Sequence, residues 1–256
     1  MSEFFSALPD YLPDAAPQPA KYRTVALIAA AGQSTRMKCG SSSKLLLPID
    51  GIPVLGHTLL AFENAVTVQD IVLVARKEDF SAFSALAEKL KISKLRFIVP
   101  GGETRQSSIL NGLKKVPRHS RYIAIADGAR CLITHEQINT INRAAYRYHA
   151  ACAATRAVDT VKICDNRGFI DRTQDRSMVW LAQTPQTFSL SLYHAAAYYA
   201  QDIGFDATDD SMLVENINKQ VRLIDCGREN IKITTPEDLL FAEAILHQRK
   251  FSRSQE

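Results

Sequence analysis

A polar loop that carries three cations, Arg36, Lys38 and Lys44, follows the first apolar run of this chain. Residues 25–55 read VALIAAAGQSTRMKCGSSSKLLLPIDGIPVL, so the apolar run stops at Gly32, and Arg36 and Lys44 follow. Small residues at such a turn let backbone N–H groups approach an anion closely. The amides around Gly32, with Arg36 and Lys44, could therefore surround a polyphosphate. The alternative is an ordinary loop with solvated cations.

Two familiar phosphate-binding patterns do not fit this loop. A Walker A motif needs G-x-x-x-x-G-K-[ST], but Gly32 and Gly40 are too far apart and Lys44 precedes Leu45. A dinucleotide fingerprint needs G-x-G-x-x-G, and only Gly32 of that pattern is present. The loop instead reads A-A-G-x-x-x-R-M, with Lys44 further along.

A single carboxylate in the stretch IADGAR is the second candidate for chemistry. Asp127 stands at the end of an apolar run, where it could bind Mg²⁺, which takes one or two carboxylates together with phosphate oxygens and water. Alternatively, Asp127 caps the next turn. If both loops follow strands of one parallel sheet, they share a crevice at its carboxyl edge. A cationic loop facing an acidic one suits a metal–nucleoside triphosphate.

Apolar runs typical of buried strands alternate with amphipathic stretches typical of helices over residues 24–158. Strands are expected at 24–31, 70–76, 95–101, 122–128 and 150–158, and helices at 53–65, 77–91, 104–116 and 134–149. Thr134 and Gln137 fit a capping box at the start of the last helix. This alternation predicts a layered α/β fold around a mainly parallel sheet.

The pattern changes after residue 158. Residues 158–188 alternate between polar and apolar side chains, with a turn at DNRG, which predicts a protruding β-arm outside the parallel sheet. Further helices are expected at 190–201, 209–217 and 235–250, and a further strand at 220–226. We expect a flexible leader at 1–21, one domain at 22–250 with the arm at about 158–185, and a flexible tail at 251–256. Alternatively, the leader is a strap that packs Phe4, Phe5 and Tyr11 on the domain.

Composition excludes several classes of protein. The 256 residues are 46% hydrophobic and 23% charged, as in globular domains with a sizeable core, and the net charge of +4 is too small for a nucleic-acid binder. No apolar run approaches the 18 residues of a membrane span. The five cysteines are odd in number and form no C-x-x-C, which favours reduced thiols in the cytoplasm.

Seven short motifs occur along the chain in a fixed order. They are AAAGQSTRM...K, GGETRQSSILNGL, DGAR, DTVK, QTPQTF, TDD and NIKITTPEDLLFAEAIL. Together they resemble the 2-C-methyl-D-erythritol 4-phosphate cytidylyltransferase family, over residues 24–246. The resemblance implies transfer of CMP from CTP to methylerythritol phosphate with Mg²⁺, within the non-mevalonate isoprenoid pathway. It also implies a three-layer nucleotide-binding (Rossmann-like) α/β fold with a mainly parallel mixed sheet and a protruding β-arm, and a homodimer formed through that arm.

The resemblance assigns roles by position. Catalytic roles fall to Arg36, Lys44, Arg176 and Lys232. Contacts with CTP fall to Ala30, Ala31, Gly32, Gly102, Arg105, Ser108 and Arg130, and contacts with the acceptor to Asp127, Thr160, Arg176, Thr184, Thr208 and Lys232, with Asp127 also holding Mg²⁺. Thr160 and Arg176 sit on the arm, which in the family crosses to the partner subunit.

The sequence departs from the family pattern in two loops. It has S-K-L at 43–45 where the family often has P-K-Q, and D-G-A-R-C at 127–131 where D-A-A-R-P is common. Both departures keep the charged groups and bear on the rigidity of the loops. A phosphate monoester is already ionised near neutral pH, so its attack on the α-phosphorus needs no general base.

Other functions remain open at this level. A cytidylyltransferase for another polyol phosphate, such as ribitol 5-phosphate, would share the CTP loop and differ near Arg176 and Lys232. A sugar-1-phosphate nucleotidyltransferase usually carries a longer signature loop. A non-catalytic nucleotide-sensing module should have lost Arg36, Lys44 or Asp127, and all three are present.

Overall fold

The computed structural model describes residues 22–32 and 43–253. The expected leader, residues 254–256 of the expected tail, and Arg36 lie outside the described residues. Among the helices described, none combines the length and the apolar character that crossing a membrane requires.

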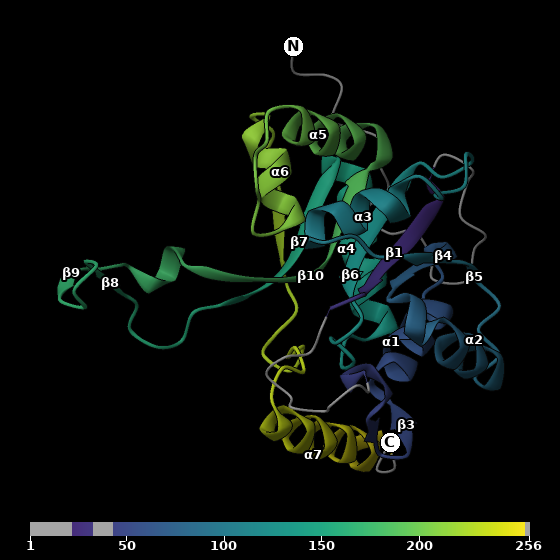
Figure 1. Cartoon of the computed structure of the whole chain (residues 1–256). Helices are drawn as coiled ribbons and strands as arrows, with labels where there is room; N and C mark the ends of the chain where they lie inside the picture. The colour runs from purple at the N-terminus through teal and green to yellow at the C-terminus, as the bar shows by residue number, and fades with distance from the viewer. Residues whose placement is uncertain (1–21, 33–42, 254–256) are drawn as a thin grey trace.

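A seven-stranded sheet forms the centre of the molecule, in the order β11-β7-β10-β6-β1-β4-β5 (Figure 1). Its strands are β1 (Thr24–Ala30), β4 (Val68–Ala75), β5 (Leu95–Pro100), β6 (Tyr122–Asp127), β7 (Ala150–Arg156), β10 (Trp180–Ser189) and β11 (Arg222–Asp225). β1 pairs in parallel with β4 and β6, β4 with β5, and β11 with β7, whereas β10 is antiparallel to β6 and β7. The predicted mainly parallel mixed sheet is confirmed.

Helices cover both faces of the sheet and make three layers. One face carries α1 (Val54–Asn64), α2 (Phe80–Lys89), α4 (His135–Tyr148) and α7 (Pro236–Arg253), and the other carries α3 (Arg105–Leu113), α5 (Leu190–Asp202) and α6 (Asp210–Asn216). Successive side chains of β1 point to opposite faces of the sheet, because side chains alternate along a strand with a period of two residues. Ala26 and Ile28 join the first core, and Val25 and Leu27 the second.

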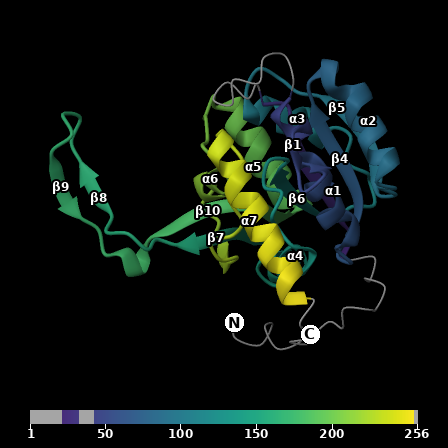
Figure 2. The same ribbon diagram turned by 90° about the horizontal axis from the view of Figure 1, so that it is seen from below.

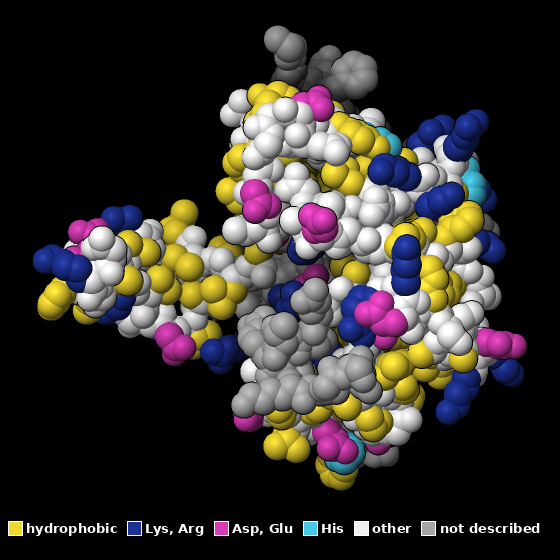
Figure 3. Space-filling model, viewed as in Figure 1, with side chains coloured by type: hydrophobic (Ala, Val, Ile, Leu, Met, Phe, Trp, Pro, Cys, Tyr) yellow, Lys and Arg dark blue, Asp and Glu magenta, His cyan; other side chains and the backbone are white. Residues whose placement is uncertain are grey.

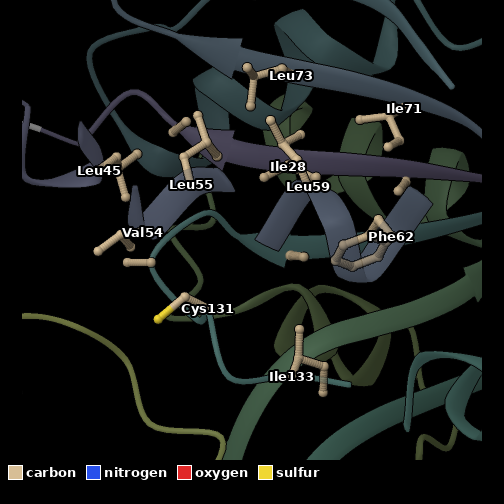
Figure 4. Close-up of a cluster of buried hydrophobic side chains, with 14 of the residues drawn as sticks. Ile28, Leu45, Val54, Leu55, Leu59, Phe62, Ile71, Leu73, Cys131 and Ile133 are labelled. Carbon is tan, nitrogen blue, oxygen red and sulfur yellow. The ribbon is translucent and has the colours of Figure 1, made fainter. Parts of the chain in front are cut away.

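The first core lies around α1. Leu55, Leu59 and Phe62 of this helix have no exposed surface and lie among strand residues such as Ile28 and Leu73 (Figure 4). Burying each such side chain stabilises the fold by about 1.5–3 kcal/mol. This packing fixes β1 and β6 side by side, and with them the loops that follow both strands.

The expected capping box at the start of α4 is present. Thr134 Oγ1 accepts a hydrogen bond from the Gln137 amide at 3.2 Å, and Gln137 Oε1 accepts one from the Thr134 amide at 3.0 Å. Both backbone N–H groups would otherwise lack an intrahelical acceptor.

The arm leaves the sheet after β7 and returns through β10 (Figures 1 and 2). It contains the short hairpin of β8 (Lys162–Cys164) and β9 (Ile170–Thr173), followed by η5 (Arg176–Met178). The prediction that all of 158–188 lies outside the parallel sheet is wrong for its last part, since β10 pairs with β6 and β7 inside the central sheet. Alternation alone does not tell an edge hairpin from a strand inserted into a sheet.

A second small hairpin was not expected from the sequence. β2 (Pro48–Ile49) and β3 (Ile52–Pro53) are joined by Asp50 and Gly51, both with positive φ, as two-residue hairpin turns often require. Strands of two residues are too short to give a periodic pattern. Lys250 and His247 of α7 form ion pairs with Asp50, so the hairpin connects the closing helix to the start of the domain.

Candidate active site

A cavity of about 410 Å³ lies at the carboxyl ends of β1 and β6. The cavity is lined by Ala29, Ala30, Ala31, Gly32, Lys44, Leu45, Gly102, Glu103, Thr104, Arg105, Ser108, Asp127, Ala129 and Lys232. These residues come from five separate stretches of the chain. The two loops that the sequence placed at one edge of the sheet do meet there, as the rule for open α/β sheets predicts.

The backbone at the end of β1 forms one wall. Ala31 lies so close to Gly101 that a Cβ atom on residue 101 would collide with the Ala31 Cβ. Gly102 is equally restricted, because a Cβ there would overlap the Ser107 side chain. Glycine at position 101 lets the loop before α3 approach the loop after β1, and glycine at position 102 lets that loop fold closely against the start of α3.

Lys44 reaches the cavity from the short helix η3 (Lys44–Leu46). The side chain of Ser43 caps this helix, and the buried Leu45 anchors it in the first core. Lys44 Nζ donates a hydrogen bond to the carbonyl oxygen of Ile233 at 2.7 Å. This contact holds the ammonium group at the cavity and connects the first loop to the segment before α7.

Asp127 is the carboxylate around which the cations gather. It ends β6, is 9% exposed, and lies with Oδ2 2.8 Å from Lys232 Nζ. Arg105 Nε and Arg130 Nε are further away, at 3.8 and 3.9 Å from its two oxygens. Burial disfavours the charged form, but the cations, Lys232 first, outweigh it and lower the pKa of Asp127 below its ordinary value. The carboxyl group is therefore ionised at neutral pH.

The segment that carries Lys232 contains no helix or strand, yet it is held at several points. The Ile233 amide donates to the Ala129 carbonyl oxygen at 2.9 Å, and Arg130 Nη1 donates to the Asn230 carbonyl oxygen at 2.6 Å. Asn230 Nδ2 donates to the Thr184 carbonyl oxygen at 3.0 Å. These bonds fix Lys232 opposite Asp127.

Ser108 and Thr184 act on the site through the backbone. Ser108 Oγ accepts a hydrogen bond from the Gly102 amide at 2.9 Å and donates one to the Thr104 carbonyl oxygen at 2.8 Å. Thr184 Oγ1 accepts one from the Asp127 amide at 2.9 Å. Both side chains are buried, and each fixes a loop at the cavity edge.

Three of the residues expected at the acceptor lie away from the cavity of their own chain. Thr160 and Arg176 are exposed on the arm, where Arg176 Nη1 donates to the Val158 carbonyl oxygen at 2.7 Å. Thr208 is exposed before α6, with its hydroxyl 3.6 Å from the Met212 sulfur. Arg36 cannot be placed, because it lies outside the described residues.

Two residues that the sequence did not single out lie directly behind the cavity. Asp210 Oδ2 accepts a hydrogen bond from Arg105 Nη2 at 2.6 Å, and Asp210 Oδ1 accepts one from the Tyr193 hydroxyl at 2.7 Å. Asp210 belongs to the TDD motif, of which only Thr208 was assigned a role. Its partner Arg105 is remote in sequence, so local spacing gives no signal for this pair.

The chemistry of the lining is that of a polyanion site. Its ionisable side chains are Lys44, Arg105, Lys232, Asp127 and Glu103. No group of three or more His, Cys, Asp or Glu residues that could enclose a metal occurs among the residues described. Asp127 alone suits Mg²⁺, which accepts one protein carboxylate when phosphate oxygens and water complete its shell.

Known proteins are similar to this chain in both sequence and fold. Residues 24–248 match the family model described as 2-C-methyl-D-erythritol 4-phosphate cytidylyltransferase. Proteins of that name from Pelotomaculum thermopropionicum and Geobacillus kaustophilus are 40% and 42% identical, over 89% and 88% of this chain and 96% and 97% of theirs. A solved 4-diphosphocytidyl-2C-methyl-D-erythritol synthase from Anaerococcus prevotii superposes with a TM-score of 0.80 at 33% identity, covering 89% of this chain and 97% of that one.

Proposed function

This chain belongs to the 2-C-methyl-D-erythritol 4-phosphate cytidylyltransferase family, and from that premise we propose that it transfers CMP from CTP to 2-C-methyl-D-erythritol 4-phosphate. The products are CDP-methylerythritol and pyrophosphate, within the non-mevalonate isoprenoid pathway. The observation that carries the proposal is the cavity lined by Lys44, Arg105 and Lys232, in which the last two lie beside the Asp127 carboxylate.

The triphosphate of CTP binds along the end of β1. Ala30, Ala31 and Gly32 offer it their backbone, and Lys44 offers a point charge that is already held at the cavity by the Ile233 carbonyl. Arg36, on the same loop, is proposed to neutralise the remaining phosphate charge.

The base and ribose lie against the loop before α3. Gly102 and Ser108 line the cavity there, and this loop is proposed to leave room for a pyrimidine and to exclude a purine sterically. Hydrogen bonds at the base edge distinguish CTP from UTP, because a mismatched buried polar group is costly.

We propose that Asp127 holds Mg²⁺ on the phosphates. The residues present fit this ion, since Asp127 is ionised, lines the cavity, and has the phosphate-binding loop beside it. When bound, Mg²⁺ would neutralise charge on the triphosphate and polarise its P–O bonds. Lys232 and Arg130 hold the Asp127 carboxylate and its loop in place.

The chemical step is an in-line displacement at the α-phosphorus. A phosphate oxygen of the acceptor forms the new P–O bond while the bond to the β-phosphate breaks, and pyrophosphate leaves with the electron pair. The attacking monoester is already ionised, so no side chain has to remove a proton. Lys44 and Lys232 stabilise the charge that develops at the transferred phosphorus.

The acceptor is proposed to contact Thr184, Thr208 and Lys232 of one subunit and Thr160 and Arg176 of the other. Arg176 lies on the arm, outside the cavity of its own chain. The arm also exposes apolar side chains, including Phe169 at 67% and Met178 at 77% exposure. Figure 3 shows hydrophobic side chains, in yellow, along the arm. A two-fold homodimer that exchanges arms would bury this surface and bring Arg176 to the partner's site.

One assay tests the proposed reaction. Purified protein is incubated with CTP, Mg²⁺ and either methylerythritol phosphate or ribitol 5-phosphate, and pyrophosphate release is measured. We expect a clear preference for methylerythritol phosphate, and for CTP over UTP and ATP. Equal or faster turnover of ribitol 5-phosphate would overturn the proposed acceptor. The cytoplasmic location expected from the cysteines stays a prediction.

Mixing two inactive variants tests the shared site. Lys44→Ala and Arg176→Ala are combined under conditions that let subunits exchange. If Arg176 acts across the dimer, each heterodimer has one intact site, and about a quarter of all sites regain activity. If Arg176 serves its own subunit, no heterodimer site is intact and activity does not return.

A further inference from the structure

Asp210 is a buried carboxylate that the proposed reaction does not use directly. It is 1% exposed, begins helix α6, and does not line the cavity. Both its oxygens are engaged, one by Arg105 Nη2 at 2.6 Å and the other by the Tyr193 hydroxyl at 2.7 Å. A buried carboxylate is tolerated when charge and hydrogen bonds satisfy it in this way.

Arg105 is placed between two carboxylates. Its Nη2 edge meets Asp210 at 2.6 Å, whereas Nε stands 3.8 Å from Asp127 Oδ1, beyond hydrogen-bond distance. The side chain also lines the cavity and is 34% exposed. The guanidinium group is therefore anchored away from the cavity and presents its remaining N–H groups toward it.

The Asp210 carboxylate is itself held rigidly. Tyr193 lies fully buried in α5 and stacks on Phe188, with ring centroids 5.3 Å apart. Burial and the neighbouring carboxylate raise the pKa of Tyr193 well above its ordinary value, so the hydroxyl stays protonated and donates. The start of α6 is tied to β10, because Gln186 donates to Asp209 at 2.7 Å and accepts from the Ser211 amide at 2.8 Å.

We propose that Asp210, oriented by Tyr193, is a positioning residue for nucleotide binding, which holds the Arg105 guanidinium at the cavity wall beside Asp127. Without the bond to Asp210, the Arg105 guanidinium would rotate toward Asp127 and form a bidentate salt bridge with its carboxylate. A bidentate salt bridge is the strongest interaction that arginine makes with a carboxylate. The pair would take both Arg105 and the Asp127 carboxylate away from a bound nucleotide. This inference rests on the proposed function in taking CTP as the ligand.

Calorimetric binding of CTP, with Mg²⁺ and without any acceptor, tests the proposal. Asp210→Asn keeps the shape and removes the charge, and we expect the Kd for CTP to rise by about 10–100-fold. In an Arg105→Ala background the same change should have almost no further effect, because the path through Arg105 is already lost. A full additional loss in that background would show that Asp210 acts on the fold alone and would overturn the proposal.

Asp79→Asn is the matched control. Asp79 is likewise buried, at 6% exposure, and accepts from Arg76 Nε and Nη2 at 2.7 and 3.0 Å, but this pair does not line the cavity. Both substitutions should lower the melting temperature, but only Asp210→Asn should weaken the binding of CTP. Equal CTP affinity in the two variants would contradict the inference.

Tyr193→Phe keeps the test available if Asp210→Asn does not fold. Removing only the hydroxyl loosens the carboxylate and should raise the Kd for CTP by about threefold to tenfold, again only while Arg105 is present. An unchanged Kd would show that the Tyr193 hydroxyl does not orient the Asp210 carboxylate, and it would overturn that part of the proposal. If the wild type binds CTP but does not turn over methylerythritol phosphate, the proposed acceptor fails and this test still stands. If the wild type does not bind CTP, both fail.

Discussion

Two buried aspartates lie at opposite edges of the same sheet, and only one belongs to the candidate site. Asp127 ends β6 at the carboxyl edge, and Asp70 lies near the start of β4 at the amino edge. Asp70 Oδ1 is 2.6 Å from Arg96 Nε, and Asp70 Oδ2 is 2.7 Å from His119 Nε2. Each carboxylate thus has cationic or potentially cationic partners, and each has a pKa below its ordinary value.

The difference lies in how fully each carboxylate is engaged. Both oxygens of Asp70 are hydrogen-bonded to side chains that stand about half exposed at the surface. Asp127 has one close cation and two near 4 Å, beside a cavity into which a ligand can enter. A larger cavity, of about 530 Å³, adjoins Asp70. Neither charge nor volume therefore identifies the site, whereas incomplete coordination at the carboxyl ends of parallel strands does.

The largest expected effect separates two lysines that make similar contacts. Lys44→Ala should lower kcat by about 10²–10³, as the loss of one preorganised donor does in other enzymes, with a smaller loss of CTP affinity. Lys94, at the amino edge, also donates to main-chain carbonyls, at 2.8 Å from Ala65 and 3.4 Å from Phe62. Steady-state kinetics of Lys94→Ala should match the wild type. A near-normal kcat for Lys44→Ala would mean that Lys44, like Lys94, makes structural contacts only and does not take part in catalysis.

The second-largest effect is expected from Asp127→Asn, which should raise the Mg²⁺ concentration that activity requires. The amide keeps the shape but not the charge that Mg²⁺ prefers, so half-maximal activity should need at least about tenfold more Mg²⁺. Titration of activity against Mg²⁺ measures this, with Asp70→Asn as the control at the other edge. Identical titration curves for the two variants would mean that Asp127 is a second structural aspartate.

Asp70→Asn should act on stability and leave catalysis alone. Arg96 and His119 would each lose a charged acceptor, and we expect the free energy of unfolding to fall by about 1–3 kcal/mol. Denaturant titration of the variant measures the loss, and kcat/KM should stay at the wild-type value. A drop in kcat/KM with unchanged stability would reverse the roles assigned to the two edges.

The smallest expected effect is on the stability of the fold at acidic pH. Burial opposes the charge on Asp70, but hydrogen bonds from Arg96 and His119 outweigh it and lower its pKa from the ordinary 3.8. A carboxyl group with a lowered folded pKa contributes stability above the unfolded pKa and loses it as pH falls through the folded one. Stability should therefore decline below about pH 4, and less steeply in Asp70→Asn. Parallel acid profiles of wild type and variant would count against this contribution.

The helices and the buried strands of this fold could be predicted because their signals are local. Apolar period, caps and turn residues placed α4, for example, with its capping box at Thr134 and Gln137. Two features were not predicted correctly. β10 was assigned to the arm because the alternation of polar and apolar residues does not reveal which strands a segment pairs with. The hairpin of β2 and β3 was missed because its strands are too short to give a periodic pattern.

The candidate site could be predicted as far as each member follows a strand or belongs to a recognisable motif. Lys44, Arg105, Asp127 and Lys232 do meet at one cavity. Asp210 and Tyr193 were missed because the contacts of Asp210 with Arg105 and with Tyr193 depend on how α3, α5 and α6 pack. The roles of Thr160 and Arg176 rest on the family resemblance and stay predictions, since a single chain holds them away from its own cavity.

The bond from Lys44 to the Ile233 carbonyl joins segments near opposite ends of the chain. In the order of the chain, Asp225 ends the last of the seven strands of the sheet, and Lys232 and Ile233 follow it. Because domains can begin to fold before the chain is finished, the sheet can form while the site still lacks one lysine and the acceptor that holds the other. As the chain emerges, the strands of the sheet therefore become available before the segment that completes the cavity.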